Sequence, residues 1–312
     1  MPKSTTPRRT PPRPTPAAGA FGAHQSIAGG FVKAVERAVE TGCECLQIFT
    51  RNINRWETTA IRPEDAAAFR EAVAKAGLAP VVAHDSYLIN PAAADADLRE
   101  KSIAGLAEEL ARAEQLGIEW VVAHPGAACG AAVDEAVARA ADGIAESLRR
   151  TRGMRAGVLI ETTAGQGSCL GASFEEIAGM LRRIDRVKSF SKRVGVCLDT
   201  CHVFAAGYPL HPRKKLDETL DAFDRTIGLC RLLVIHANDS KKPLGSRVDR
   251  HEAIGEGCIG KAAFEDLVNH PRLAGIPMIL ETPKEGPDGK AGPERDLANL
   301  ARLRRFRRAG NA

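Results

Sequence analysis

The stretch WVVAHPG, residues 120–126, is a run of apolar residues that ends in a histidine and a Pro-Gly pair. Seven other segments repeat the pattern, in which a short apolar run closes on polar or ionisable residues. They are AFGAHQS (20–26), CLQIFT (45–50), PVVAHDS (80–86), GVLIETT (157–163), VGVCLDTCH (194–202), LLVIHAND (232–239) and PMILETP (277–283). Runs of this length and composition predict buried β-strands.

Stretches of helical period, rich in Ala, Glu, Arg and Leu, separate these segments. They are residues 29–42, 63–77, 97–117, 134–150, 173–184, 216–228 and 260–270. Eight strand–helix units over roughly 260 residues predict an α/β protein with a single (β/α)8 TIM barrel, whose site lies at the C-terminal ends of the strands. A doubly wound open sheet is the alternative, but no G-x-G-x-x-G turn follows the first strand.

The 312 residues divide into a predicted barrel and two basic ends. Residues 1–18 are rich in Pro, Thr and Arg, which predicts a disordered tail, and residues 302–312 predict a basic C-terminal tail. Residues 19–301 form the predicted barrel. The two ends hold nine of the Lys and Arg residues and no acid, so the net charge of +5 becomes −4 for residues 17–301. An acidic body attracts nucleic acid only when bound cations reverse its sign.

The composition also bears on the compartment. The longest apolar runs are too short for a membrane span, and the N-terminus lacks the apolar segment of a secretion signal. We therefore expect a cytoplasmic, nucleoid-associated protein with no membrane partner. The eight cysteines form no C-x-x-C pair, and most are expected to be small core residues. Cys197 and Cys201 flank Asp199, which leaves a thiolate metal site as an alternative to oxygen and nitrogen ligands.

Histidines and carboxylates gather at the expected C-terminal ends of the strands. Five of the eight histidines fall there, and a sixth, His251, follows Asp249 in SRVDRHEAIGEG (246–257), the loop after strand seven. The main candidates are His84, His124, Glu161, Asp199, His202, His236, Asp249, His251 and Glu281, and His24 and Asp239 also lie at strand ends. His211 and His270 precede prolines in loops and are expected to be exposed.

Such a set predicts a metal site. Burying so many ionisable groups at one barrel mouth without a counter-charge costs several kcal/mol for each ion. Imidazole and carboxylate together suit zinc or manganese, and nine ligands fit three divalent ions. Three such ions change the charge of the body from −4 to +2, and clustered divalent ions suit the hydrolysis of a phosphodiester.

Several motifs resemble the endonuclease IV family of apurinic/apyrimidinic (AP) endonucleases. They are GAHQSIAGG, HDSYLIN, AHPG, IETTAGQG, LDTCH, IHANDSK, GSRVDRHEAIGEGCIG and ILETP, between about residues 20 and 283. The resemblance implies a metal-dependent phosphodiesterase of DNA repair, a deoxyribonuclease IV. Such an enzyme hydrolyses the DNA backbone 5′ to an abasic site, leaving a 3′-hydroxyl and a 5′-deoxyribose phosphate, and removes 3′ blocking groups. Its partner is double-stranded DNA with abasic sites or blocked 3′ ends, and we expect a monomer.

The resemblance also implies three Zn²⁺ ions per chain, with Mn²⁺ as an alternative at one position. His84 and His124 hold one zinc and share Glu161 with a second. Asp199, His236 and Glu281 complete the second set, and His202, Asp249 and His251 form the third. Glu161 is the expected catalytic residue, because it bridges two ions and orients the nucleophile. His24 matches a family histidine that is not a ligand, and we expect it to hydrogen-bond behind the ligands.

The DNA contacts follow less directly. Tyr87 and Leu88 match the residues that relatives push into the minor groove beside the lesion, although they could also simply cap their strand. Asn54 stands where relatives usually have an arginine, so either Arg55 takes over that contact or the contact is weaker here. Arg247 and Arg250 are candidate phosphate ligands or partners of nearby acids.

Two other functions remain open, and metal content separates the first of them from the nuclease. A sugar isomerase of the xylose isomerase type needs about four ligands for one or two ions, which leaves Asp249 and His251 without a role. A DNA-damage binder without turnover is the other alternative. Elemental analysis of the purified protein should give close to three divalent ions per chain, and one or two ions would favour the isomerase.

Overall fold

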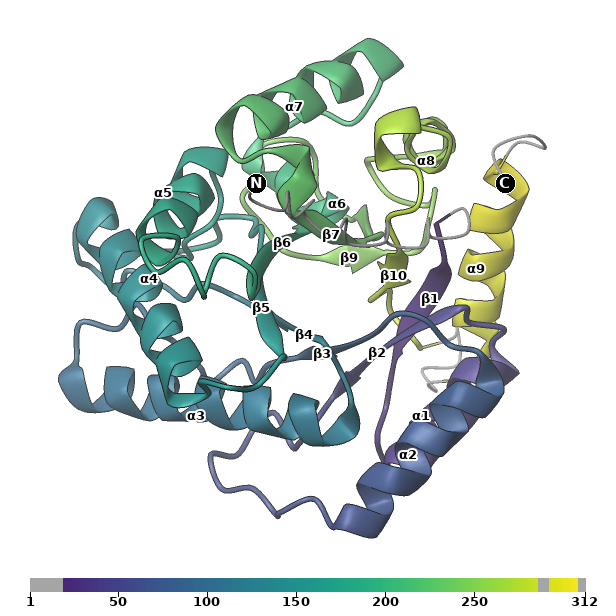
Figure 1. Cartoon of the computed structure of the whole chain (residues 1–312). Coiled ribbons are helices and arrows are strands. Elements are labelled where there is room, and N and C mark those ends of the chain that lie inside the picture. The colour runs from purple at the N-terminus through teal and green to yellow at the C-terminus, as the bar shows by residue number, and fades with distance from the viewer. Residues whose placement is uncertain (1–18, 286–291, 308–312) are drawn as a thin grey trace, which may run out of the picture.

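The computed structural model describes residues 19–285 and 292–307. Eight parallel strands form a closed barrel in the spatial order β1-β10-β7-β6-β5-β4-β3-β2 (Figure 1). The strands are β1 (Phe21–Gln25), β2 (Cys45–Phe49), β3 (Val81–His84), β4 (Trp120–Ala123), β5 (Gly157–Glu161), β6 (Val194–Asp199), β7 (Leu232–His236) and β10 (Met278–Leu280). All eight predicted strands are present, and the prediction of a (β/α)8 barrel is confirmed.

Helices form a ring outside the strands (Figure 1). The seven predicted helical stretches correspond to α1 (Phe31–Glu40), α2 (Pro63–Ala76), α3 (Ala96–Leu116), α4 (Val133–Arg150), α5 (Phe174–Ile184), α7 (Arg213–Thr226) and α8 (Lys261–Val268). Two further α-helices, α6 (Thr200–Ala206) and α9 (Glu294–Phe306), were not expected. Two short 3-10 helices, η1 (Leu229–Arg231) and η2 (Pro271–Leu273), precede β7 and β10, and a separate antiparallel pair joins β8 (Asp239–Ser240) to β9 (His251–Glu252).

The alternation of side chains along each strand separates an outer core from the barrel interior. Outward-facing residues such as Ile48 and Ile160 pack with the helices, whose buried residues include Leu110 and Phe223. Seven strands contribute one residue each to an apolar interior layer, which consists of Cys45, Val82, Val122, Leu159, Cys197, Val234 and Ile279. At this level β1 has Gly22, where a Cβ would lie only 1.9 Å from the carbonyl oxygen of Cys45.

The next inward position of every strand, two residues further on, is polar. These positions are His24, Gln47, His84, His124, Glu161, Asp199, His236 and Glu281. The barrel therefore has a dry apolar layer, and directly above it a polar layer at the C-terminal ends of the strands. This second layer is the floor of the site described below.

Helix α9 crosses the expected boundary between barrel and C-terminal tail at residue 302. Leu303 is fully buried and Phe306 is 8% exposed, so this part of the helix belongs to the packed core. Arg302 pairs with Glu256 at 2.9 Å, and the guanidinium of Arg307 lies 3.9 Å from the ring centroid of Phe21. The expected tail thus begins no earlier than residue 308. Residues 1–18 and 308–312 lie outside the described residues.

Two expectations about single residue types were wrong. His270 is buried rather than exposed, because its Nε2 lies 2.8 Å from Asp217 Oδ1 and its Nδ1 accepts the backbone N–H of Arg272. His211 is exposed, as expected. Four of the eight cysteines are exposed rather than in the core, namely Cys129, Cys169, Cys230 and Cys258. Within the described ranges, no helix has both the length and the apolar character needed to cross a bilayer.

We expect Leu303→Ala to destabilise the protein, because it empties a buried position between α9 and the barrel. The loss should be about 2–5 kcal/mol, which corresponds to a melting temperature lower by roughly 5–15 °C. Arg305→Ala, at an exposed position of the same helix, should stay within about 0.5 kcal/mol of the unsubstituted protein. Thermal unfolding followed by circular dichroism measures both, and equal melting temperatures would contradict the packing of α9 described above.

Candidate metal centre at the barrel mouth

The barrel mouth brings together all nine side chains that the sequence singled out as candidate ligands. Six of them come from the polar interior layer, at the end of a strand or one residue beyond it. The other three come from elements above the barrel. His202 lies on α6, Asp249 lies in the loop between β8 and β9, and His251 lies on β9. The nine divide into three groups in which potential ligand atoms lie within 4.8 Å of one another.

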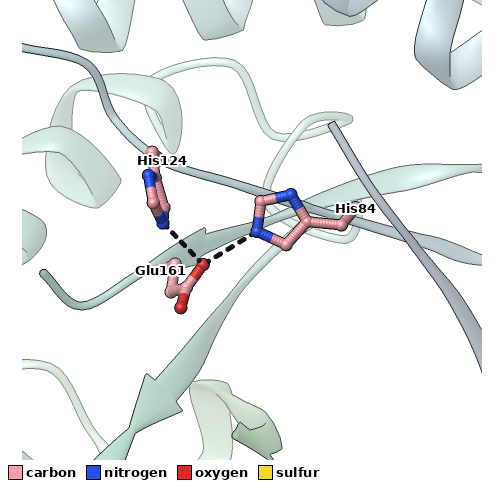
Figure 2. Close-up of side chains that lie close together, drawn as sticks. All are labelled: His84, His124 and Glu161. Carbon is pink, nitrogen blue, oxygen red and sulfur yellow. Dashed lines mark hydrogen bonds and ion pairs between the residues drawn. The ribbon is translucent and has the colours of Figure 1, made fainter. Parts of the chain in front are cut away.

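The first group consists of His84, His124 and Glu161. The Nε2 atoms of both histidines lie 3.1 Å from the same carboxylate oxygen, Oε2 of Glu161. Figure 2 shows the two imidazoles directed at that oxygen from neighbouring strands. His84 and Glu161 are buried, whereas His124 is partly exposed and forms the solvent side of the group.

The second group consists of Glu161, Asp199, His236 and Glu281. His236 Nδ1 lies 3.0 Å from Glu161 Oε1 and 3.1 Å from Glu281 Oε2, and it lies 3.9 Å from Asp199 Oδ2. One nitrogen therefore faces three carboxylates at the centre of the barrel mouth. Glu161 belongs to both groups and offers one oxygen to each.

The third group consists of His202, Asp249 and His251. The Asp249 carboxylate lies between the two imidazoles, 3.1 Å from His202 Nε2 and 3.3 Å from His251 Nε2. Asp199 helps to place His202, because its side chain caps the N-terminus of α6 by accepting the His202 backbone N–H at 2.9 Å. The short helix that the sequence did not predict thus carries a candidate ligand in its first turn.

The imidazoles of these groups are oriented by hydrogen bonds on their far side. In four histidines the nitrogen that points away from the other members of its own group lies within hydrogen-bonding distance of an oxygen. The pairs are His84 Nδ1 with Asp85 O at 2.9 Å, His202 Nδ1 with Thr162 O at 2.8 Å, His251 Nδ1 with Glu281 O at 3.1 Å and His236 Nε2 with Gln47 Oε1 at 2.8 Å. Each far nitrogen must donate to its oxygen, so the other nitrogen presents a lone pair to the centre, as a metal ligand requires.

The electrostatics of the site favour ionised carboxylates. Although burial opposes ionisation, His236 and the neighbouring imidazoles hold the pKa values of Glu161 and Glu281 well below their ordinary range. Burial also opposes ionisation of Asp249, but His202 and His251 outweigh it and lower the pKa of this carboxyl to about 2. Burial is also outweighed at His202, where Asp199, Asp249 and Glu161 raise the pKa well above its ordinary value. The four carboxylates therefore need positive charge beside them, which protons on the imidazoles or bound cations supply.

Two further observations fit divalent cations. The Nε2 atoms of His202 and His251 are buried and have no hydrogen-bond partner among the described residues, despite the nearby Asp249 carboxylate. The nitrogen–oxygen separations of 3.0–3.1 Å between His84, His124, His236 and the Glu161 carboxylate also match a shared ion. Two ligand atoms at about 2.0–2.1 Å from a tetrahedral ion lie about 3.4 Å apart. The histidine and carboxylate clusters thus fit metal binding.

The cysteines beside Asp199 fit this role less well. Cys201 lies within 4.8 Å of ligand atoms of Asp199 and His251, but burial raises the pKa of its thiol to about 12. Its S–H faces the carbonyl oxygen of Arg250 at 3.7 Å. Cys197 belongs to the apolar layer below, where burial likewise raises its thiol pKa to about 12. Because the thiolate is the form that binds metals, the oxygen and nitrogen donors are favoured.

Sequence reasoning missed two amides that connect the ligands. Gln47 is the β2 member of the polar layer and contacts His236, Glu281 and His24. Asn238 donates to Asp199 Oδ2 at 2.6 Å and accepts the backbone N–H of Glu281 at 2.8 Å. The signal for Gln47 was its position two residues after Cys45, in phase with the histidines of the other strands. Nothing in the local sequence distinguishes Asn238.

Asp239, which the sequence placed at a strand end with His236, is not part of the centre. Its buried carboxylate instead accepts backbone N–H groups, on Oδ1 from Ser240 and Ile259 at 2.7 and 2.9 Å, and on Oδ2 from Gly255 and Gly257 at 2.9 and 3.0 Å. At Gly257 a Cβ would lie 2.6 Å from Asp239 Oδ1, so the close approach requires glycine. Asp239 thereby fixes the loop that follows His251.

Of the residues singled out for DNA contact, Asn54 and Tyr87 lie beside the centre. Tyr87 is 59% exposed, and its ring centroid lies 5.7 Å from that of His84 and 6.0 Å from that of His124. Leu88 is half-buried beside it. Asn54 and Tyr87 line a groove of about 630 Å³ that also includes His24, His251, Glu281 and Lys284. Arg55, Arg247 and Arg250 are exposed.

Comparisons with known proteins agree with this architecture. Residues 35–305 match the family described as xylose isomerase-like TIM barrel. A protein of Chloroflexus aurantiacus named probable endonuclease 4 is 48% identical over 284 residues, which cover 91% of this chain and 96% of the relative. The crystal structure of endonuclease IV from Thermus thermophilus superimposes with a TM-score of 0.79 at 39% identity, covering 92% of this chain and 98% of that one. A D-tagatose 3-epimerase-like protein shares the fold, with a TM-score of 0.67 at 18% identity over 92% of this chain and 96% of that one.

We expect Asp239→Asn to loosen the loop after His251, because an amide can accept with only one of the two positions that the carboxylate uses. Each buried N–H that loses its acceptor should cost about 1–3 kcal/mol. Amide hydrogen exchange of Gly255, Gly257 and Ile259 should become faster, and urea denaturation should show a lower free energy of unfolding. Asp134→Asn, an exposed position in the first turn of α4, is the control. Unchanged exchange in the Asp239 variant would show that the carboxylate does not hold the loop.

Proposed function

Because the chain belongs to the endonuclease IV family of xylose isomerase-like TIM barrels, we propose that it is a DNA-repair endonuclease specific for abasic sites. It hydrolyses the phosphodiester 5′ to the lesion, leaving a 3′-hydroxyl and a 5′-deoxyribose phosphate. The same hydrolysis removes blocking groups from 3′ ends. The observation that carries the proposal is the division of nine histidine and carboxylate side chains into three adjoining groups around Glu161.

In this proposal each group holds one divalent ion. His84, His124 and Glu161 hold the first Zn²⁺, and Asp199, His236 and Glu281 hold the second together with Glu161. His202, Asp249 and His251 hold the third, and Mn²⁺ is an alternative at one of the three positions. Bound zinc supplies a water of lowered pKa and stabilises the charge that develops on the phosphate oxygens.

Glu161 is the proposed catalytic residue. Its carboxylate lies between the first two groups, and four imidazoles approach its two oxygens, those of His84, His124, His202 and His236. A buried carboxylate held in this way keeps one orientation and stays ionised. It is therefore suited to align the attacking water with the phosphorus, while the fixed geometry limits reorganisation during the reaction.

The charge distribution supports a polyanionic substrate once the centre is loaded. The body of the chain, residues 17–301, has a net charge of −4, which opposes DNA binding on its own. Three divalent ions reverse that sign and concentrate the positive charge at the barrel mouth. Arg247 and Arg250 are exposed beside the third group, and we assign to them contacts with backbone phosphates.

Recognition of the lesion falls to the rim of the groove. We propose that Tyr87 and Leu88 enter the minor groove next to the missing base, where unstacking costs least. The exposure of the Tyr87 ring directly above two candidate ligands supports this role. Asn54 lies in the groove wall and cannot replace the charge of an arginine, so either exposed Arg55 takes over that contact or the contact is weaker here.

The remaining parts of the proposal concern assembly and place. The barrel closes within one chain, and all nine candidate ligands come from that chain, so a monomer suffices for activity. We propose that the protein works in the cytoplasm on the nucleoid. A sugar isomerase on this fold would leave the third group, at His202, Asp249 and His251, without a function.

We expect Glu161→Gln to abolish incision while lesion binding is largely retained. The neutral amide cannot offer a negatively charged oxygen to both groups and no longer fixes the attacking water, so the rate should fall by at least about 100-fold. The assay uses the zinc-loaded protein and a duplex with one tetrahydrofuran abasic analogue, with incision followed on a gel and binding by fluorescence anisotropy.

Glu71→Gln, at an exposed position of α2, is the matched control and should cut as the unsubstituted protein does. Unchanged turnover in the Glu161 variant would refute the role given to this residue. An unsubstituted protein that binds the duplex and leaves it whole would instead indicate a damage binder without catalysis.

A further inference from the structure

Gln47 occupies a position that seven other strands fill with a histidine or a carboxylate. It lies on β2, is fully buried, and pairs in register with His24 on β1. The residue below it on the same face is Cys45, in the apolar layer. A buried amide at this level must satisfy its hydrogen bonds with protein groups, because unsatisfied it would cost about 1–3 kcal/mol.

Three contacts satisfy this amide, and all three lead to the centre. Gln47 Nε2 donates to Glu281 Oε1 at 2.6 Å and lies 3.0 Å from His24 Nδ1. Gln47 Oε1 lies 2.8 Å from His236 Nε2. One side chain thus connects two residues of the second group with the histidine behind them.

The chemistry of the neighbours allows only one orientation of the amide. Its NH₂ must face the ionised Glu281 carboxylate, because the reverse orientation would bring two oxygen atoms to 2.6 Å. The carbonyl oxygen then faces His236, so His236 carries its proton on Nε2. The second N–H of the amide points to His24 Nδ1, so His24 must accept there and carry its own proton on Nε2.

These assignments have a direct consequence for the second group. With the proton on Nε2, His236 presents the lone pair of Nδ1 toward Glu161 and Glu281, at 3.0 and 3.1 Å. Because Oε1 of Glu281 accepts from Gln47, the other carboxylate oxygen, Oε2, faces His236 Nδ1. The amide therefore selects both the tautomer of the imidazole and the rotation of the carboxylate.

We propose that Gln47 is a positioning residue that holds His236 and Glu281 in the arrangement needed to bind the cation of the second group. The inference rests on the proposed function, since it concerns the metal centre given there. Gln47 belongs to none of the three groups of candidate ligands. It acts only through the two ligands that it orients, and partners of this kind typically change metal affinity by about 10–100-fold when they are lost.

The test compares Gln47→Met with Gln25→Met. Methionine keeps the length and approximate volume of glutamine but removes both hydrogen-bonding groups. Gln25 is also buried, but it lies on the face of β1 opposite to His24, outside the barrel interior. Its Nε2 donates to Asp296 at 2.8 Å and to Thr41 at 3.4 Å. The second variant thus reports the general cost of losing a buried amide away from the centre.

The zinc-loaded proteins are incubated with increasing concentrations of a chelator, and elemental analysis measures the zinc that each protein retains. The melting temperature of each protein is measured separately. Gln47→Met should lose one zinc per chain at a chelator concentration about 10–100-fold lower than the unsubstituted protein requires. Gln25→Met should lower the melting temperature without changing zinc retention. Equal retention by Gln47→Met and the unsubstituted protein would overturn the inference while leaving the proposed function standing. An unsubstituted protein that retains no zinc after loading would overturn both the inference and the proposed function.

A second measurement needs no variant. Long-range ¹H–¹⁵N correlation spectra of the zinc-loaded, unsubstituted protein report which ring nitrogen of each histidine carries a proton. His236 and His24 should both be protonated on Nε2 and not on Nδ1. A proton on Nδ1 of either ring would overturn the inference even if the methionine variant failed to fold.

Discussion

The proximity of a buried carboxylate to several imidazoles, at Glu161, is the constraint on which the rest of the site depends. Glu161 has no exposed surface, and its oxygens lie 3.0–3.3 Å from nitrogens of His84, His124, His202 and His236. An isolated carboxylate in that position would be strongly destabilising, because its charge has left water. Positive charge must therefore accompany it, and the surrounding strands, helix and loop are arranged to bring that charge from several directions.

Much of this arrangement followed from the sequence because two simple periodicities coincide. Alternation along a strand places residues two apart on one face, and the closed barrel brings the same level of every strand to one axis. The apolar run that ends at His124 therefore predicted a strand with a ligand at its C-terminal end, and in the structure Val122 lies in the interior layer directly below. The same reasoning applied to Leu159 with Glu161 and to Val234 with His236. The helices between them followed from their 3.6-residue period.

The errors came from features that short-range patterns do not encode. CLQIFT contains no histidine or carboxylate, so the polar position of Gln47 was overlooked although its phase was correct. Asp239 has the composition of a ligand, but its role depends on a loop that returns near it about twenty residues later in the sequence. The arginines of residues 302–307 suggested a tail, yet Leu303 and Phe306 between them have a helical spacing that buries them. Such outcomes depend on tertiary contacts, which override local composition.

The three groups differ in how they are attached to the protein. Every side chain of the first two comes from the interior of the barrel, whereas His202, Asp249 and His251 come from α6, β9 and the loop between them. Asp239 ties that outer segment down, because its carboxylate accepts backbone N–H groups of the loop after His251 and its strand, β8, pairs with β9. The third group can therefore change independently of the other two. An insertion, deletion or substitution in the outer segment alters it, while the closed barrel and the six ligands at the ends of its strands keep their positions.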